Sequence, residues 1–182
     1  MRIISGQFGG RRFNPPKNLP VRPTTDQAKE ALFNIFNNNF DFENIAVLDL
    51  FAGTGAISFE FASRGVEKIT CVDQNFNCCS FIKATAAQLN ISPIVQKADV
   101  FKWVENNNSR KFDLIFADPP YDLKNLKDIP DLIFKAGILN ENGWFVLEHP
   151  KDHSFATHPN FKEHRNYGNV NFSVFKTTTT LQ

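Results

Sequence analysis

Short apolar segments that suit β-strands alternate with helical segments along most of this chain, and that alternation limits the fold more than any other feature. The expected strands are residues 45–50, 68–73, 93–98, 112–117 and 144–148. The helices expected among them are residues 56–64, 76–89, 99–105 and 126–136. Because the first strand is almost wholly apolar, it must be covered on both faces. The pattern therefore predicts an α/β fold of three layers, with helices on both faces of a mostly parallel sheet.

The N-terminal residues follow a different pattern. Residues 2–6 and 11–13 alternate loosely around Gly9-Gly10, which predicts a short β-hairpin, and a proline-rich linker follows it. Thr24 and Gln27 have the spacing of a capping box, so a further helix is expected to begin there.

The C-terminal residues return to strand-like alternation. Residues 161–166 and 170–177 lie on either side of a turn, which predicts an antiparallel hairpin. The last residues, 177–182, are expected to fray.

Charge is divided unevenly between a short N-terminal extension and the rest of the chain. With 20 Lys and Arg against 19 Asp and Glu, the net charge is only +1, which excludes a strongly basic protein that coats nucleic acid. Residues 1–22 nevertheless contain five basic residues and no acid. The five are Arg2, Arg11, Arg12, Lys17 and Arg22. We therefore expect a basic extension of residues 1–22 and a mildly acidic domain of residues 23–182.

Several classes of protein are excluded by what the sequence lacks. No apolar run approaches the roughly 18 residues of a membrane span, and the N-terminus lacks the apolar core of a signal peptide. The three cysteines and four histidines show no metal-ligand spacing, so no metal is expected. We expect free thiols in a reducing cytoplasm, and a core filled largely by the 20 phenylalanines.

The loop after the first expected strand, from Asp49 to Gly55, is a candidate ligand site. Gly53 and Gly55 allow a sharp turn and a close approach of the backbone to a ligand. A dinucleotide site would have a third glycine where Ser58 stands, and Asp49 would repel a pyrophosphate. A carboxylate there suits a cation, and S-adenosylmethionine, with its sulfonium and ammonium groups, is the obvious candidate. The alternative is a turn that begins a helix and binds nothing.

Two more acids follow the next strands at the same edge of the sheet. Asp73 lies 20 residues after Gly53, where an acid accepts hydrogen bonds from ribose hydroxyls in nucleotide-binding folds. Asp99 follows the third strand, where it could accept from the exocyclic amine of adenine. Either acid could instead cap the helix that follows it. The other candidates for the cofactor site are Phe51, Ala52, Thr54, Asn75, Val100 and Thr24.

Asp118-Pro119-Pro120-Tyr121, directly after the fourth strand, is the sharpest motif. The prolines fix the backbone and have no N–H to compete for their carbonyls. The Asp118 carboxylate and the Pro119 carbonyl could therefore both accept from one planar NH2 group and direct its lone pair at an incoming methyl. Tyr121 offers a flat face on which a base could stack, a contact worth roughly 1–3 kcal/mol. The alternative is a simple turn from strand to loop that binds nothing. We favour a functional motif, because three other acids are expected at the same edge of the sheet.

With these motifs in place, the sequence resembles a known family. Gly53-Thr54-Gly55 and Asp-Pro-Pro-Tyr, in that order, look like the class I methyltransferases that methylate exocyclic amines. More narrowly, the chain resembles the bacterial 16S rRNA guanine-N2 methyltransferases over Arg2-Ile-Ile-Ser-Gly6, Arg22-Pro-Thr-Thr-Asp26, Glu30-Ala-Leu-Phe-Asn34 and Asp49-Leu-Phe-Ala-Gly-Thr-Gly55. The resemblance covers nearly the whole chain. Family members often carry an arginine where Gln27 stands, which puts one phosphate contact in doubt.

The resemblance implies a Rossmann-like sheet of seven strands with an antiparallel last strand. It implies S-adenosylmethionine as methyl donor, S-adenosylhomocysteine as product, and no metal. The acceptor would be the N2 amine of a guanine in 16S rRNA, guanine 966, within the assembled or assembling 30S subunit. The Asp118–Tyr121 motif would then be catalytic, and the five basic residues of the extension would contact RNA. We expect a monomer with no obligate protein partner.

Other functions remain open on the sequence alone. DNA adenine-N6 methyltransferases share the amine-binding logic, but no insertion here is long enough for their recognition domain. Protein glutamine-N5 methyltransferases favour Asn at the position of Asp118 and usually add an N-terminal helical domain. A non-catalytic RNA-binding module would keep the basic extension, but it would not need four strand-end acids around one crevice. A dehydrogenase is the least expected, because of Asp49 and Ser58.

Overall fold

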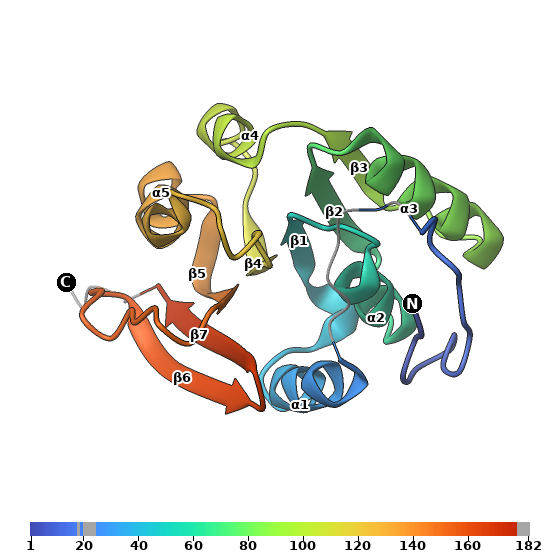
Figure 1. Cartoon of the computed structure of the whole chain (residues 1–182), viewed down its shortest axis with the longest axis horizontal. Helices are drawn as coiled ribbons and strands as arrows, with labels where there is room; N and C mark the ends of the chain where they lie inside the picture. The colour runs from blue at the N-terminus through green and yellow to red at the C-terminus, as the bar shows by residue number, and fades with distance from the viewer. Residues whose placement is uncertain (18, 20–24, 178–182) are drawn as a thin grey trace.

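The computed structural model describes residues 1–17, 19 and 25–177. Over these residues the chain forms a sheet in the strand order β3-β2-β1-β4-β5-β7-β6 (Figure 1). The strands are β1 (Ala46–Leu50), β2 (Lys68–Asp73), β3 (Ile94–Lys97), β4 (Phe112–Ala117), β5 (Leu139–His149), β6 (Phe161–Tyr167) and β7 (Val170–Lys176). The helices are α1 (Asp26–Asn37), α2 (Ala56–Ser63), α3 (Phe76–Leu89), α4 (Val100–Asn106) and α5 (Ile129–Ala136).

The strand directions confirm the mostly parallel sheet with a reversed last strand. β1 pairs in parallel with β2 and β4, and the parallel pairing continues to β3 on one side and to β5 on the other. β7 alone runs antiparallel to both of its neighbours, β5 and β6. The chain therefore adds strands on one side of β1, as far as β3, and then crosses over to add β4 on the other side of β1. In open α/β sheets, a crevice for ligands lies at such a switch point, at the carboxyl ends of the strands.

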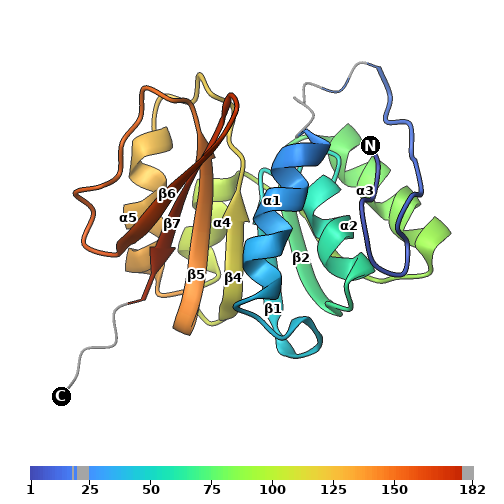
Figure 2. The same ribbon diagram turned by 90° about the horizontal axis from the view of Figure 1, so that it is seen from below.

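Two separate apolar cores confirm the three layers. Successive residues of β1 point to opposite faces, so Val47 belongs to one core and Leu48 to the other, and both are fully buried. Helices α1, α2 and α3 contribute to the first core, and α4 and α5 contribute to the second (Figures 1 and 2). A strand buried on both faces favours apolar residues on both of them, which is why β1 is apolar at every position except Asp49.

Phenylalanine rings fill the centre of the first core, as the composition predicts. The Phe61 ring of α2 lies 4.6 Å from the ring of Phe33 and 5.4 Å from that of Phe36, both on α1. Phe42, in the turn that follows α1, lies 5.7 Å from Phe61 on another side. These centroid distances are typical of favourable ring pairs. The aromatic cluster thus packs α1 against α2.

The fifth strand begins earlier than its sequence pattern indicates. The sequence predicts a start at residue 144, but β5 begins at Leu139, which pairs with Phe112 of β4. Residues 140–142 are polar, so the sequence pattern does not indicate the first part of this strand. The pairing of β5 with β4 also shifts in register between Phe112 and Leu114. The helix expected from residue 126 is also divided. A 3-10 turn, Leu126–Asp128, precedes α5, whose first turn contains Pro130.

The predicted N-terminal hairpin is not confirmed as a pair of strands. The segment does fold back, with Ile3 N donating to the Arg11 carbonyl at 3.0 Å and Phe13 N to the Met1 carbonyl at 2.9 Å, but it makes only one isolated antiparallel bridge, between Arg2 and Arg12. Near its tip the backbone donors are directed at α2: Gln7 N donates to the Ser63 carbonyl at 2.7 Å, and Phe8 N to Ser63 Oγ at 2.9 Å. Gly6, at φ +81°, lies so close that an added Cβ would come within 1.9 Å of the same carbonyl oxygen.

Helix α1 begins one residue later than predicted. Its N-cap is Thr25, whose hydroxyl accepts a hydrogen bond from Ala28 N at 3.2 Å, so the capping box built on Thr24 is wrong. Thr24 itself lies outside the described residues, as do Arg22 and residues 178–182 of the expected C-terminal tail.

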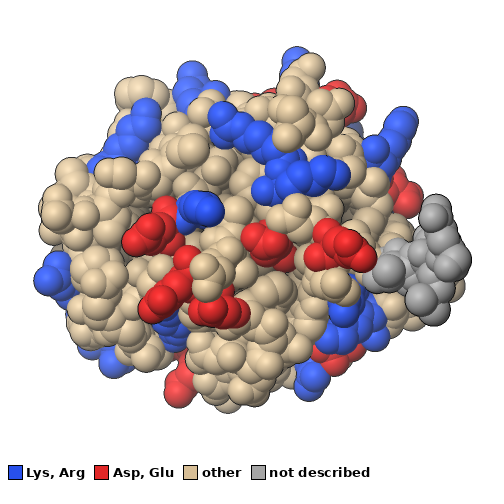
Figure 3. All heavy atoms as spheres, turned by 180° about the vertical axis from the view of Figure 1, so that it is seen from behind, with Lys and Arg blue, Asp and Glu red and all other residues tan. Residues whose placement is uncertain are grey.

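Seen from behind the view of Figure 1, the surface carries Lys, Arg, Asp and Glu side chains, and neither sign covers it (Figure 3). Such a mixed surface attracts a polyanion weakly. Within the described part of the chain, no helix has the length and hydropathy needed to cross a bilayer.

Candidate functional site

A cavity of about 1240 Å³ lies at the carboxyl ends of the parallel strands, where the strand order turns back. It gathers most of the residues that the sequence analysis singled out. From the strand ends come Asp49, Phe51, Ala52, Gly53, Thr54, Asp73, Asn75, Asp99, Val100, Asp118, Pro119, Pro120 and Tyr121, and from the N-terminal segment come Arg2 and Arg12. The cavity therefore has an acidic wall of strand-end carboxylates and a basic wall from the start of the chain.

Of the candidates in the described part of the chain, Gly55, Arg11 and Lys17 lie outside the lining of this cavity. Gly55 adopts φ +72° at the start of α2, and an added Cβ would lie 2.9 Å from the Phe59 ring and 3.0 Å from Ile82. Its role is thus to let α2 pack closely. Arg11 places its guanidinium 5.4 Å from the centre of the Phe8 ring.

The β1–α2 loop is bent tightly where it faces the cavity. Phe51 adopts φ 57° and Gly53 adopts φ 55°, both in the left-handed region. That region is uncommon for a residue with a side chain, and such strain is often found at ligand sites. Gly55 N donates to the Ala52 carbonyl at 2.7 Å and closes the turn.

Asp49 is buried at the back of the cavity, against the start of α2. One of its carboxylate oxygens accepts from Ser58 Oγ at 2.6 Å and from Ser58 N at 3.2 Å. Ser58, which stands where a dinucleotide site has glycine, therefore serves as the partner of this carboxylate. Burial raises the pKa of Asp49 from its ordinary value of 3.8 to about 7, although the hydrogen bonds from Ser58 oppose that shift.

The raised pKa of Asp49 gives a testable dependence of stability on pH. The folded chain binds this proton more tightly than the unfolded chain does, so the carboxyl favours folding below about pH 4 and loses that contribution as the pH rises to about 7. We expect the free energy of unfolding, measured with urea, to fall from pH 5 to pH 8. Asp49→Asn should remove this part of the fall, whereas Asp128→Asn, at an exposed acid, should keep it. An unchanged pH dependence in Asp49→Asn would contradict the assignment.

Asp73 ties the loops after β1 and β2 together. Its two carboxylate oxygens accept from Gly53 N at 2.8 Å and from Asn75 N at 2.7 Å. The cap of α3 is Asn75, whose side chain accepts from Asn77 N and Cys78 N, so Asp73 does not serve as that cap. Asp99 does cap its helix: it accepts from Lys102 N at 3.0 Å at the start of α4 while also lining the cavity.

The Asp118–Tyr121 motif follows β4 directly, at the centre of the sheet. Asp118 N donates to the Leu50 carbonyl of β1 at 3.4 Å, which holds the start of the motif against the neighbouring strand. Tyr121 Oη donates to Glu148 Oε1 at 3.0 Å. Glu148 is a buried residue near the end of β5, and the sequence analysis did not select it. No signal in the sequence indicates this contact, because Glu148 is one of several polar residues of β5 and lies 27 residues from Tyr121.

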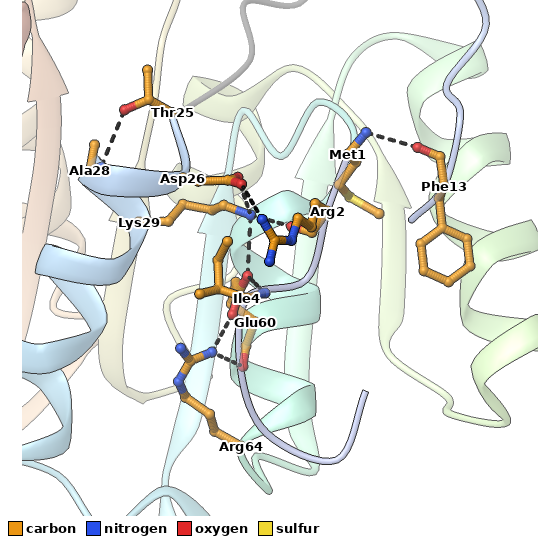
Figure 4. Close-up of polar contacts among 10 residues, drawn as sticks. All are labelled: Met1, Arg2, Ile4, Phe13, Thr25, Asp26, Ala28, Lys29, Glu60 and Arg64. Atoms are coloured by element: carbon orange, nitrogen blue, oxygen red, sulfur yellow. Dashed lines mark hydrogen bonds and ion pairs between the residues drawn. The ribbon is translucent and has the colours of Figure 1, made fainter. Parts of the chain in front are cut away.

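Two residues of α1 that the sequence analysis missed, Asp26 and Lys29, also line the cavity, beside the basic wall. Lys29 is only 2% exposed and lies beside the apolar stripe of its helix, where a lysine is rare. Its ammonium donates to the backbone carbonyl of Arg2 and lies 3.1 Å from Glu60 Oε1 (Figure 4). Asp26 lies 3.4 Å from the Arg2 guanidinium. Together these contacts fix the N-terminal segment beside the cavity.

No group of three or more His, Cys, Asp or Glu side chains among the described residues is arranged to hold a metal ion. His149, at the end of β5, is fully buried between Pro150 O and Ser173 Oγ, and burial lowers its pKa. The three cysteines are buried free thiols, as expected.

Comparison with known proteins gives the family. Residues 1–176 match the model of the family described as conserved hypothetical protein 95. A Bacillus subtilis protein named "Putative rRNA methyltransferase YlbH" is 35% identical over 156 residues, which are 84% of each chain. Ribosomal RNA small subunit methyltransferase D of Escherichia coli K12 is 29% identical over 174 residues, 91% of this chain and 83% of that protein.

Solved structures give the same result for the fold. Hypothetical protein TTHA0928 of Thermus thermophilus superposes with a TM-score of 0.86 at 25% identity, over 97% of this chain and 99% of that one. The family match spans nearly the whole chain, and relatives named as rRNA methyltransferases align along most of their length. We conclude that this chain belongs to the family described as conserved hypothetical protein 95, and that it is a member of the rRNA methyltransferases.

Proposed function

We propose that the protein transfers a methyl group from S-adenosylmethionine to the N2 amine of a guanine in 16S rRNA. By the resemblance of its motifs, the acceptor is guanine 966 in the assembled or assembling 30S subunit. One observation carries the proposal: a single cavity joins four strand-end acids, the Asp118–Tyr121 motif and a basic wall. The first two suit a cationic donor and an amine acceptor, and the third suits the phosphates of RNA.

The acidic wall is chemically matched to the methyl donor. When bound, S-adenosylmethionine supplies an electrophilic methyl group on a sulfonium. Asp49 places a carboxylate behind the glycine loop, where positive charge on the ligand would favour its ionised form. Each oxygen of Asp73 accepts one backbone N–H and keeps capacity to accept from a ribose hydroxyl. Asp99 and Val100 line the neighbouring part of the cavity, where they would contact the adenine of the donor.

The Asp118 carboxylate and the Pro119 carbonyl would accept hydrogen bonds from the amine that is methylated. The lone pair of guanine N2 is delocalised into the ring, so hydrogen bonds that favour a pyramidal nitrogen are strongest in the transition state and lower the barrier there. Tyr121, held through its hydroxyl by Glu148, would present its ring to the base. Orientation alone can supply about 7–11 kcal/mol of a barrier. The proton that leaves the amine can pass to Asp118 or to water.

The basic residues of the N-terminal extension would bind the phosphates of the RNA backbone. A base paired in a helix has to turn out of its stack before it can reach the cavity. The candidates are Arg2, Arg11, Arg12, Lys17 and Arg22, which would orient the enzyme without reading sequence. Specificity would then come from the shape of the subunit. An acceptor of this kind is found in the cytoplasm, and the protein would act there as a monomer with no obligate protein partner.

The test is transfer of a tritiated methyl group to small subunits, compared with deproteinised 16S rRNA, DNA and a protein release factor. We expect label on small subunits, and we expect nucleoside analysis to place it in N2-methylguanosine. Label in N6-methyladenosine, or on glutamine of the release factor, would replace the proposal by one of the competing reactions. Absence of transfer to every acceptor, with RNA binding retained, would indicate a non-catalytic RNA-binding module.

A further inference from the structure

Three ionic side chains are buried together between α1 and α2, and one of them, Lys29, also lines the cavity. Lys29 is 2% exposed, Glu60 is fully buried, and Arg64 is 10% exposed. One Glu60 oxygen lies 3.1 Å from the Lys29 ammonium, and the other accepts from Arg64 (Figure 4). These contacts leave the ions well paired, which buried charges require.

This cluster is bonded to the backbone of the N-terminal segment. The Lys29 ammonium donates to the carbonyl of Arg2, and Ile4 N donates to Glu60 Oε1 at 2.6 Å. Between them, Ile3 is fully buried in the core. A buried ion pair contributes little net stability compared with apolar side chains of similar volume, because desolvation offsets most of the attraction. Its distinctive effect here is to fix where residues 2–4 lie.

Fixing residues 2–4 places Arg2 at the cavity, opposite Arg12. The two arginines face each other across the isolated bridge, and both line the cavity. Like charges on directly opposed residues destabilise a bridge. Asp26 offsets one of them, through a contact that is about half exposed and therefore weak. Within the described ranges, no ion pair joins Arg12 to an acid. The pair thus presents positive charge toward the cavity that a bound anion would stabilise.

We propose that Lys29 is a positioning residue, which holds Arg2 in place so that Arg2 and Arg12 together bind one phosphodiester of the acceptor strand. This inference rests on the proposed function, since a guanine placed against Asp118 brings the phosphates of its own strand to the edge of the cavity. A planar guanidinium binds phosphate through two parallel hydrogen bonds, which makes Arg suited to this contact. Lys29 itself, being buried, acts through Arg2 and does not touch the RNA.

The experiment measures methyl transfer to unmethylated small subunits at several salt concentrations. Arg2→Ala is expected to raise KM for subunits about tenfold, the effect of losing one charge-assisted contact. It should also reduce the slope of log KM against log salt concentration by about 0.7–0.9, the value for one phosphate contact. The kcat and the donor affinity, measured by calorimetry, should stay within about twofold. Lys68→Ala, which removes an exposed charge at the amino end of β2, is the matched control and should change none of these values.

Lys29 is tested by its coupling to Arg2. Lys29→Met should reproduce the changes in KM and salt slope seen in Arg2→Ala, the double variant should be no worse than Lys29→Met alone, and Lys29→Arg should restore most of the loss. Additive effects of the two substitutions, or a normal KM and salt slope in Lys29→Met, would overturn the positioning role. If Lys29→Met does not fold, Glu60→Gln replaces it, because it keeps the shape of the cluster but removes the charge that holds Lys29. An unchanged KM and slope in Glu60→Gln would then overturn the role.

The outcomes separate this inference from the function on which it rests. Normal kinetics in Arg2→Ala, with N2-methylguanosine formed by the unmodified protein, overturns the phosphate site alone. Failure of the unmodified protein to form N2-methylguanosine overturns the proposed function, whatever the variants do.

Discussion

Asp118→Ala is expected to lower kcat for methyl transfer by about 10²–10³-fold, the usual loss when one preorganised polar group is removed from a transition state. The substitution removes a hydrogen-bond acceptor for the amine, while the donor's acidic wall keeps Asp49, Asp73 and Asp99. Donor affinity should therefore change by less than about twofold. Single-turnover transfer to small subunits, together with calorimetric titration of S-adenosylmethionine, measures both quantities.

Two further variants sharpen the result for Asp118. Asp118→Asn keeps one acceptor oxygen but loses the charge, so its rate should fall between those of Asp118→Ala and the unmodified protein. Asp128→Ala removes an exposed acid that makes no side-chain cap to α5, and it should leave transfer unchanged. Full activity in Asp118→Ala would refute the role of the Asp118 carboxylate in holding the amine. Loss of donor binding in the same variant would move Asp118 to the donor side of the cavity.

Phe61→Ala is expected to lower the free energy of unfolding by about 3–5 kcal/mol, the usual range for removing a buried phenylalanine ring. Phe61 is fully buried and contacts the rings of Phe33, Phe36 and Phe42, so little around it can collapse into the space it leaves. A domain of this kind is stable by only about 5–15 kcal/mol, so the loss would be a large share of the total. Urea unfolding at one fixed pH measures it.

Phe76→Ala provides the matched control, since the same ring is removed from the first turn of α3 where it is 66% exposed. Its effect on the free energy of unfolding should be within about 0.5 kcal/mol. A loss below about 1 kcal/mol in Phe61→Ala would show that the aromatic cluster does not hold α1 against α2.

Most of the sheet could be predicted from the sequence because its strands are buried on both faces or follow clear turn signals. β1, β2 and β4 were found within one residue of their ends, since each is a largely apolar run with an acid at or next to its carboxyl end. The start of β5 was missed because residues 140–142 are polar and a register shift lets them continue the strand. The N-terminal hairpin forms only one bridge in place of two strands, because the backbone donors of Gln7 and Phe8 bond to α2, a contact that alternation along the chain cannot reveal.

The acids of the site could be found from sequence because all parallel strands end at one edge, so that position along the chain predicts position in space. The partners of those acids could not. Ser58 and Glu148 were recognisable only once the fold had set them beside Asp49 and Tyr121. Lys29 was hidden for another reason. A lysine next to an apolar stripe normally extends to solvent, and the contacts of Lys29 with Glu60, 31 residues away, and with the Arg2 carbonyl explain its burial.

The docking of the first residues on α2 has a consequence for the order in which the molecule is completed. Ile4 N donates to Glu60 across 56 residues of sequence, so the N-terminal segment, which is synthesised before α2, can dock only after α2 has been made. Contacts so distant along the chain close late, because the entropy of the intervening loop has to be overcome first. The basic wall is therefore a product of finished folding. A nascent or partly unfolded chain would carry the same arginines, yet it would lack the arrangement that gathers them opposite the acids, and so would not compete for RNA in the way the finished enzyme does.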